Sequence, residues 1–156
     1  MNIAENTSLA WRAWADLSTA ELYELLAFRQ AIFVVEQASP YPDLDGRDSA
    51  ARHLILRHDG PLIGYLRLIA PNIDDNPHVR LGRVAIAETE RGNGYARLIV
   101  EEALRLAASL YPGHSIEIGA QTYLEPFYTS FGFVRSTSPY DDFGVPHIDM
   151  IRPADA

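Results

Sequence analysis

The stretch ETERGNGYARLIVEEALRLA, residues 88–107, starts as a polar turn, passes through two glycines and continues as an amphipathic helix. Such a turn places free backbone N–H groups and the positive end of a helix dipole where a negative group can bind. Gly94 allows the backbone to approach a phosphate closely, and the small side chain of Ala96 keeps the first helical turn near it. The stretch predicts an anion site at a helix start, and an ordinary glycine-rich turn is the alternative.

Two other phosphate-binding patterns do not fit this turn. The G-x-G-x-x-G fingerprint of dinucleotide sites needs glycine at position 97, where the sequence has Arg97. The P-loop needs a lysine, and all 13 basic residues of the chain are arginines. Any phosphate contact must therefore come from the backbone and from arginine.

Composition limits the function classes further. The 156 residues predict a single domain over 1–156, and the net charge of −8 disfavours a nucleic-acid partner. No run approaches the roughly 20 apolar residues of a membrane span, so no membrane partner is expected. Without Cys or Lys there is no thiol nucleophile, disulfide or Schiff base. The N-terminal residues 1–10 lack a secretory pattern, which predicts a cytoplasmic protein.

The patterning along the chain predicts a mixed α/β order. Ser18 and Glu21 form a capping box that opens a helix running to about Phe33. The Asp59-Gly60 pair predicts the turn of a β-hairpin. The other expected elements are a strand from Leu9, a loop over 38–50, hairpin strands 53–58 and 62–70, a strand 79–87, a helix 94–110, a strand 115–120, a short helix over 123–131, and strands 132–136 and 147–153. The order strand, helix, strand across residues 79–120 is a βαβ unit, so the sheet should be mixed.

Two segments in this order resemble a known family. The motif R-G-N-G-Y-A, residues 91–96, resembles the pyrophosphate-binding pattern [QR]-x-x-G-x-[GA] of the GNAT acyltransferases. The segment LEPFYTSFGF, residues 124–133, resembles the FYxxxGF segment that follows one strand later in that family. The resemblance implies the GNAT acyl-CoA N-acyltransferase fold, α/β or α+β, with a mixed, mostly antiparallel sheet flanked by helices. It implies an acetyl-CoA-dependent N-acetyltransferase that transfers the acetyl group directly.

The resemblance also assigns roles to residues. Tyr128 would be the general acid that protonates the departing thiolate of coenzyme A, a role that suits a phenol of high pKa. Packing of Tyr128 between its Phe neighbours is the alternative. Gln121 stands where many members have an Asn. The implied cofactor-binding residues are Val84, Ala85, Ile86, Arg91, Gly92, Asn93, Gly94, Tyr95, Ala96, Gln121 and Phe127.

A narrower resemblance is to the small bacterial ElaA-like subfamily. It rests on FRQAIFVVEQ at 28–37, PYPDLDGRD at 40–48, RHLIL at 52–56 and VPHIDM at 145–150. The subfamily's acceptor is not settled, so the resemblance supplies the reaction class, a bacterial cytoplasmic location and an amine acceptor that is a small molecule or a peptide.

The catalytic base is sought among five residues, because an amine that is protonated at pH 7 must lose a proton to attack. Glu36 follows the first helix, while His53 and His147 begin strands and have a suitable intrinsic pKa. The loop aspartates Asp43 and Asp45 are further candidates. Each has an ordinary structural role as its alternative.

Acidic residues predict a rim around the acceptor side. Asp43, Asp45 and Asp48 follow the first helix, and Asp141 and Asp142 precede the last strand. Together they would recruit a cationic amine, and a solvated surface is the alternative. The segment DLDGRD mimics the start of a calcium loop but lacks its closing Glu, so no metal is expected.

Two alternative functions and one assembly hypothesis stay open. The chain is also similar to acyl-homoserine-lactone synthases in its N-terminal half, although it is short for that group. A non-catalytic acyl-CoA-binding module is the other alternative, which the presence of Tyr128 disfavours. Val34-Val35 and the final strand are candidate edges for a homodimer.

Overall fold

The computed structural model describes residues 5–155; the first four residues of the N-terminal stretch considered above lie outside this range. Within it, eight strands form one sheet in the order β1-β2-β3-β4-β5-β8-β6, with β7 paired to β8. The strands are β1 Thr7–Ala13, β2 Ala51–His58, β3 Leu62–Ile69, β4 Val79–Ile86, β5 Ile116–Gln121, β6 Val134–Arg135, β7 Tyr140–Asp142 and β8 Val145–Arg152. The helices are α1 Thr19–Gln30, α2 Tyr95–Leu110 and α3 Glu125–Thr129; a π-helical segment Ala31–Glu36 extends α1, and 3₁₀ turns occur at 14–16, 48–50, 88–90 and 122–124.

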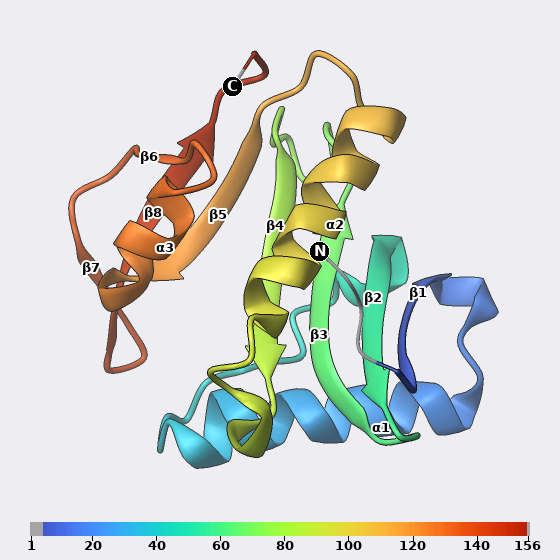
Figure 1. The fold of residues 1–156 in the computed structure, drawn as a ribbon. Helices are drawn as coiled ribbons and strands as arrows, with labels where there is room; N and C mark the ends of the chain where they lie inside the picture. The colour runs from blue at the N-terminus through green and yellow to red at the C-terminus, as the bar shows by residue number, and fades with distance from the viewer. Residues whose placement is uncertain (1–4, 156) are drawn as a thin grey trace.

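The sheet is mixed and mostly antiparallel, as predicted. Only β4 and β5 are paired in parallel, and α2 makes the crossover between them. In Figure 1, α2 lies across one face of the sheet while α1 runs along the other.

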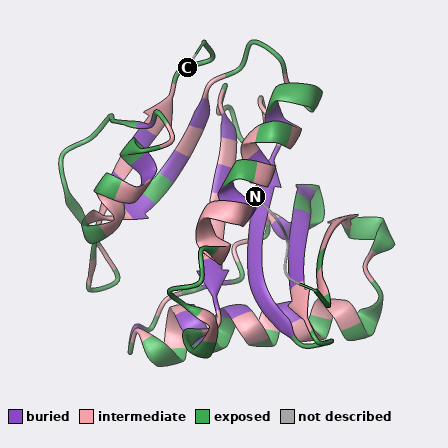
Figure 2. Cartoon of the chain, in the orientation of Figure 1, coloured by how far each residue is buried: buried purple, intermediate pink, exposed green. Residues whose placement is uncertain are grey.

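Both faces of the central strands are buried, because a helix covers each of them. Leu54 and Leu56 pack into the cluster that contains Ile99 of α2, whereas Ile55 packs into the cluster that contains Leu25 of α1. Alternate residues of a strand point to opposite faces, so β2 and β3 read as nearly continuous apolar runs. Figure 2 shows these two strands buried over most of their length.

Local signals in the sequence placed several element boundaries. The side chain of Ser18 accepts a hydrogen bond from the Glu21 N–H at 3.0 Å and caps α1, as predicted. Asp59 and Gly60 both have positive φ, 53° and 103°, which confirms the predicted hairpin turn between β2 and β3. The short strand β7 was not predicted; it forms a hairpin with β8.

The sheet opens between β4 and β5. These two strands pair at Val79–Ile116 and Arg80–Glu117, near their starts, and not beyond. A bulge in β4 follows, where Arg83 has φ of 54° and the register with β3 shifts. Because a bulge bends a strand and increases its twist, β4 turns away from β5 and leaves a V-shaped gap. The sequence predicted a regular strand over 79–87, so this bulge is a correction.

Neither of the two predicted dimer edges is a free strand edge in the structure. The last strand, β8, is paired with β5 on one side and with β6 and β7 on the other, so its backbone is not available as an edge. Val34 and Val35 lie in the π-helical segment and not in a strand.

Candidate active site

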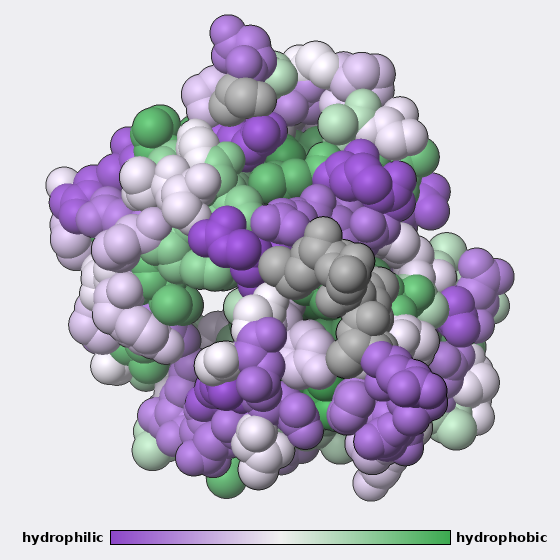
Figure 3. Space-filling view, in the orientation of Figure 1, coloured by the Kyte–Doolittle hydropathy of each residue, from purple (hydrophilic) through white to green (hydrophobic). Residues whose placement is uncertain are grey.

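Two cavities meet in the gap between β4 and β5. The larger, about 290 Å³, is lined by several arginines and is called the arginine-lined cavity below. The smaller, about 220 Å³, reaches the start of α2 and is called the helix-side cavity. Figure 3 shows the surface hollowed at this gap. The residues that line both cavities are Phe33, Gln37, Val84, Gln121, Leu124 and Tyr128.

The glycine motif forms the outer end of the helix-side cavity. Gly94 is the N-cap of α2 with φ of 82°, and no side chain caps this helix start. The first turn of α2 has no acidic residue, so its free N–H groups and helix dipole favour an anion. A Cβ added at Gly92 or Gly94 would meet nothing within 4 Å, which leaves open space beside the backbone. These features fit the pyrophosphate site that the motif predicted.

Arg91 is anchored beside this turn. Its Nε donates to the Ile86 carbonyl at 3.0 Å, and its Nη2 donates to Glu36 at 2.9 Å. Ile86, Arg91, Ala96 and Phe127 all line the helix-side cavity. Glu36, a predicted candidate base, is therefore the ion-pair partner of the motif arginine, at the helix-side cavity and away from the arginine-lined one.

Tyr128 lies where the two cavities meet. Its side chain is 3% exposed and packs edge-on against Phe127 and Phe133 at ring distances of 5.1 and 5.9 Å. Within residues 5–155 its hydroxyl makes no hydrogen bond, although it lines both cavities. Burial raises the pKa of Tyr128, so the group is a neutral proton donor. The packed and the catalytic interpretations of Tyr128 are compatible in this geometry.

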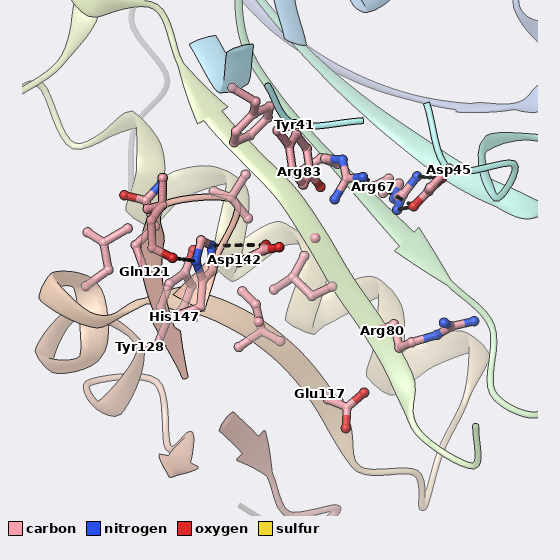
Figure 4. A pocket seen from close by; sticks show the side chains of 18 of the residues that line it. Tyr41, Asp45, Arg67, Arg80, Arg83, Glu117, Gln121, Tyr128, Asp142 and His147 are labelled. Carbon is pink, nitrogen blue, oxygen red and sulfur yellow. Dashed lines mark hydrogen bonds and ion pairs between the residues drawn. The ribbon is translucent and has the colours of Figure 1, made fainter. Parts of the chain in front are cut away.

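His147 lines the arginine-lined cavity on the same side as Tyr128 (Figure 4). Its Nδ1–H donates to the Val145 carbonyl at 2.8 Å, which leaves Nε2 as the acceptor of the neutral ring. Nε2 lies 3.9 Å from an Asp142 carboxylate oxygen, and Tyr140 stacks on the imidazole at 6.2 Å. Pairing of β5 with β8 sets His147 opposite Gln121.

The structure places His53, the other candidate histidine, away from both cavities. Its side chain is 0% exposed and lines neither of them. Nε2 donates to the Asp48 carbonyl at 2.9 Å, and Nδ1 accepts from the Tyr65 hydroxyl at 2.6 Å. Burial lowers the pKa of His53, which keeps the ring neutral with both nitrogens occupied. The geometry therefore disfavours His53 as a base and favours a structural role for it.

The predicted acidic rim is wrong for the loop after α1. Asp43 and Asp48 are buried and pair with Arg29 at 2.9 and 2.7 Å, and Asp45 pairs with Arg67. These ion pairs connect to others and form one continuous arginine–aspartate network. Its members are Arg29, Arg47, Arg67, Arg80, Arg83, Asp43, Asp45, Asp48 and Asp74.

The arginine–aspartate network favours the charged form of Asp45 and Asp48. Burial opposes ionisation of Asp45 and Asp48, but hydrogen bonds from Arg67 and Arg29 hold the pKa of each well below its usual range. The sequence reasoning missed this network. Its signal was Arg67 within the apolar run LIGYLRLIA, where a charge on a strand buried on both faces requires a partner.

Two kinds of feature do not occur among the described residues. No helix within residues 5–155 is long and apolar enough to cross a membrane. Over the same residues, no group of three or more His, Cys, Asp or Glu side chains is placed to hold a metal ion.

Comparison with known proteins places this geometry in a family. Residues 19–152 match the sequence profile of the acetyltransferase (GNAT) domain. The chain is 41% identical to a UPF0039 protein of Synechocystis over 143 residues, covering 91% of this chain and 92% of that protein. It is 38% identical to protein ElaA of Escherichia coli over 140 residues, covering 88% and 91% of the two chains.

A solved structure agrees with these sequence matches. The crystal structure of an acyl-CoA N-acyltransferase from Pseudomonas aeruginosa superposes with a TM-score of 0.89 at 37% identity, covering 94% of this chain and 99% of that chain. The predicted GNAT fold and the ElaA-like resemblance are thereby confirmed.

Proposed function

The chain belongs to the GNAT acetyltransferase family, and from this premise we propose that it transfers an acetyl group from acetyl-CoA directly to the amine of a small molecule or peptide. The observation that carries the proposal is that two cavities, one at the glycine motif and one lined by arginines, meet at the Tyr128 side chain. Direct transfer needs this arrangement, because thioester and amine must approach the same point from opposite sides.

Acetyl-CoA would occupy the helix-side cavity. The N–H groups after Gly94 and the Arg91 guanidinium would hold the pyrophosphate, which is the negative group that the motif attracts. Beyond Arg80, β4 has no β5 partner, so the edge of Val84 to Ile86 that faces the gap is open to an extended pantetheine arm, apart from the Ile86 carbonyl that Arg91 occupies. One N–H of this segment would polarise the thioester carbonyl. Glu36 would release Arg91 when a phosphate binds.

The acceptor amine would enter through the arginine-lined cavity. His147 accepts the amine proton at Nε2, and Asp142 stabilises the imidazolium that forms. The amine nitrogen forms a bond to the carbonyl carbon of the thioester, and the carbon–sulfur bond breaks with its electron pair on sulfur. Tyr128 donates its proton to that thiolate, and exchange with solvent restores both side chains. Acetyl transfer therefore passes through no acyl-enzyme.

Calorimetric titration with acetyl-CoA tests the proposal, with free CoA as a comparison and NADH as a negative control. We expect binding of both CoA ligands and none of NADH, followed by acetylation of amines in a mixed panel of small molecules and peptides. If acetyl-CoA does not bind, the proposed function is wrong. If it binds but no amine in the panel is acetylated, a non-catalytic acyl-CoA-binding role replaces it.

A further inference from the structure

The arginine-lined cavity has two walls of different charge. One wall comes from β3, β4 and the loop after α1, and the other from β5, β7 and β8. Figure 4 shows Arg67 and Arg83 on one side of the cavity and Asp142 and His147 on the other. The charged lining residues of the first wall are Arg47, Arg67, Arg80, Arg83 and Asp45; those of the second are Glu117 and Asp142.

The first wall keeps an excess of positive charge in spite of its ion pairs. The arginine–aspartate network joins five arginines to four aspartates, so one positive charge is not balanced within it. Asp43 and Asp48 are buried behind the wall and do not line the cavity. Part of the charge that compensates the lining arginines therefore lies behind the wall.

Two of these arginines have donors left for a ligand. The Arg83 Nη2 donates to the Asp43 carbonyl and to the Asp45 carboxylate, and Nε lies 2.9 Å from the Asp43 carboxylate. The guanidinium also stacks over Tyr41, 4.9 Å from the ring centre. Arg80 uses Nη2 for the Ile73 carbonyl and for Asp74. Within residues 5–155 neither Nη1 has an acceptor, and neither is a buried atom. Both donors point to accessible space.

The second wall has the opposite character. Asp142 places a negative charge beside the His147 imidazole that would accept the amine proton. Glu117 adds a second carboxylate at the far end of this wall, where β5 pairs with Arg80 of β4, and it accepts a hydrogen bond from Asn76 at 2.9 Å. An ammonium group is attracted to this wall, and an anionic group to the first.

We propose that the acceptor is an amino carboxylate, a molecule of the amino-acid class. Its carboxylate would bind Arg83 and Arg80, and its amine would face His147 and Asp142. The inference rests on the proposed function, because it names the acceptor of that reaction. A carboxylate carries the single negative charge that matches the excess of the network, whereas a phosphate monoester would carry nearly two. The products are the N-acetyl amino carboxylate and free CoA, with the carboxylate unchanged.

Matched acceptors test the charge requirement. For each of several amino acids, kcat/KM for acetylation is compared with that of its carboxamide and of the decarboxylated amine. We expect the amino acid to be favoured by about 10- to 100-fold, because charge-assisted bonds to arginine are lost in the two analogues. The carboxamide keeps the size and the amine, so it isolates the charge.

Variants locate the requirement on the first wall. Arg83→Gln and Arg80→Gln should each reduce kcat/KM for amino acids by about tenfold and leave the carboxamides nearly unchanged. Arg105→Gln removes the same charge from an exposed site on α2 and serves as the control. Circular dichroism checks folding, and Arg80→Gln, which lies at the edge of the network, keeps the test valid if Arg83→Gln does not fold.

Two outcomes separate the inference from the function on which it rests. Acetylation of carboxamides or plain amines as efficient as that of amino acids overturns the inference and leaves N-acetyl transfer intact. Absence of acetyl-CoA binding overturns the proposed function, and the inference with it. Equal losses for amino acids and carboxamides in both wall variants would also overturn it, because the arginines would then be structural only.

Discussion

The helix-side cavity and the arginine-lined cavity meet at Tyr128 but are built in different ways. The first combines the helix start at residues 91–96 with mostly apolar residues from the π-helical segment, β4, the end of β5 and α3. The second has charged residues from five separated segments, with ion pairs between residues up to 40 positions apart. The anion site of the first cavity is a local backbone conformation, whereas the charged wall of the second is a product of sheet register. The two halves therefore respond to mutation in different ways.

The largest effect is expected where the two halves meet. Tyr128→Phe removes the hydroxyl and keeps the ring packing, so stability should change little while kcat falls by about 10²- to 10⁴-fold. Steady-state kinetics at neutral pH, with acetyl-CoA binding measured in parallel, check this. Tyr23→Phe, at an exposed position of α1, is the matched control. Unchanged turnover would remove the acid role from Tyr128.

The next largest effect is expected on the free energy of unfolding, to which the arginine–aspartate network of the second cavity contributes. Arg29→Leu leaves Asp43 and Asp48 buried without their main partner, which should lower the free energy of unfolding by about 3–5 kcal/mol. Arg105→Leu breaks an exposed pair on α2 and should lower the free energy of unfolding far less. Urea denaturation measures both variants. Equal, small losses would show that the arginine–aspartate network does not support the wall of the cavity.

The smallest effect tests whether the helix-side cavity binds its anion through backbone groups. Gly94→Ala and Gly113→Ala place a methyl group at similar φ angles, 82° and 78°, at opposite ends of α2, with nothing within 4 Å of the added atom. Both should lose about 1–2 kcal/mol of stability from the left-handed backbone. Only Gly94→Ala should also weaken acetyl-CoA binding, because its methyl group occupies the anion site. Calorimetry measures the acetyl-CoA affinity of both variants. Equal affinities would show that residues 88–98 form an ordinary helix start and not an anion site.

The glycine turn at the helix-side cavity could be predicted from the sequence because its signals are local. The glycines of residues 91–96, the Ser18 cap and the Asp59-Gly60 turn each act on backbone groups within a few residues. The roles of Tyr128 and of the motif came from the resemblance to the GNAT family, which the family match confirms as an assignment of the chain and not of each residue's role.

The ionic half was predicted incorrectly for the opposite reason. Asp43 and Asp48 were predicted to form an exposed acidic rim, because no residue near them in the sequence indicates that Arg29 and Arg83 are their partners. Among the candidate bases, His53 and His147 both begin strands by pattern. Only the position of each strand in the sheet buries the first and opens the second to the cavity.

The sequence by itself determined the element types, the glycine turn that begins α2, and the family, since these depend on residue spacing and local backbone preference. Tertiary structure alone decided that β4 bulges at Arg83 and parts from β5, and that arginines on β3 and β4 reach aspartates of the loop after α1. The physical reason is the distance along the sequence over which each kind of interaction acts. A cap or a turn is stabilised by hydrogen bonds across three or four residues, whereas ion pairs and cavity walls depend on strand register and on the burial that the whole sheet imposes.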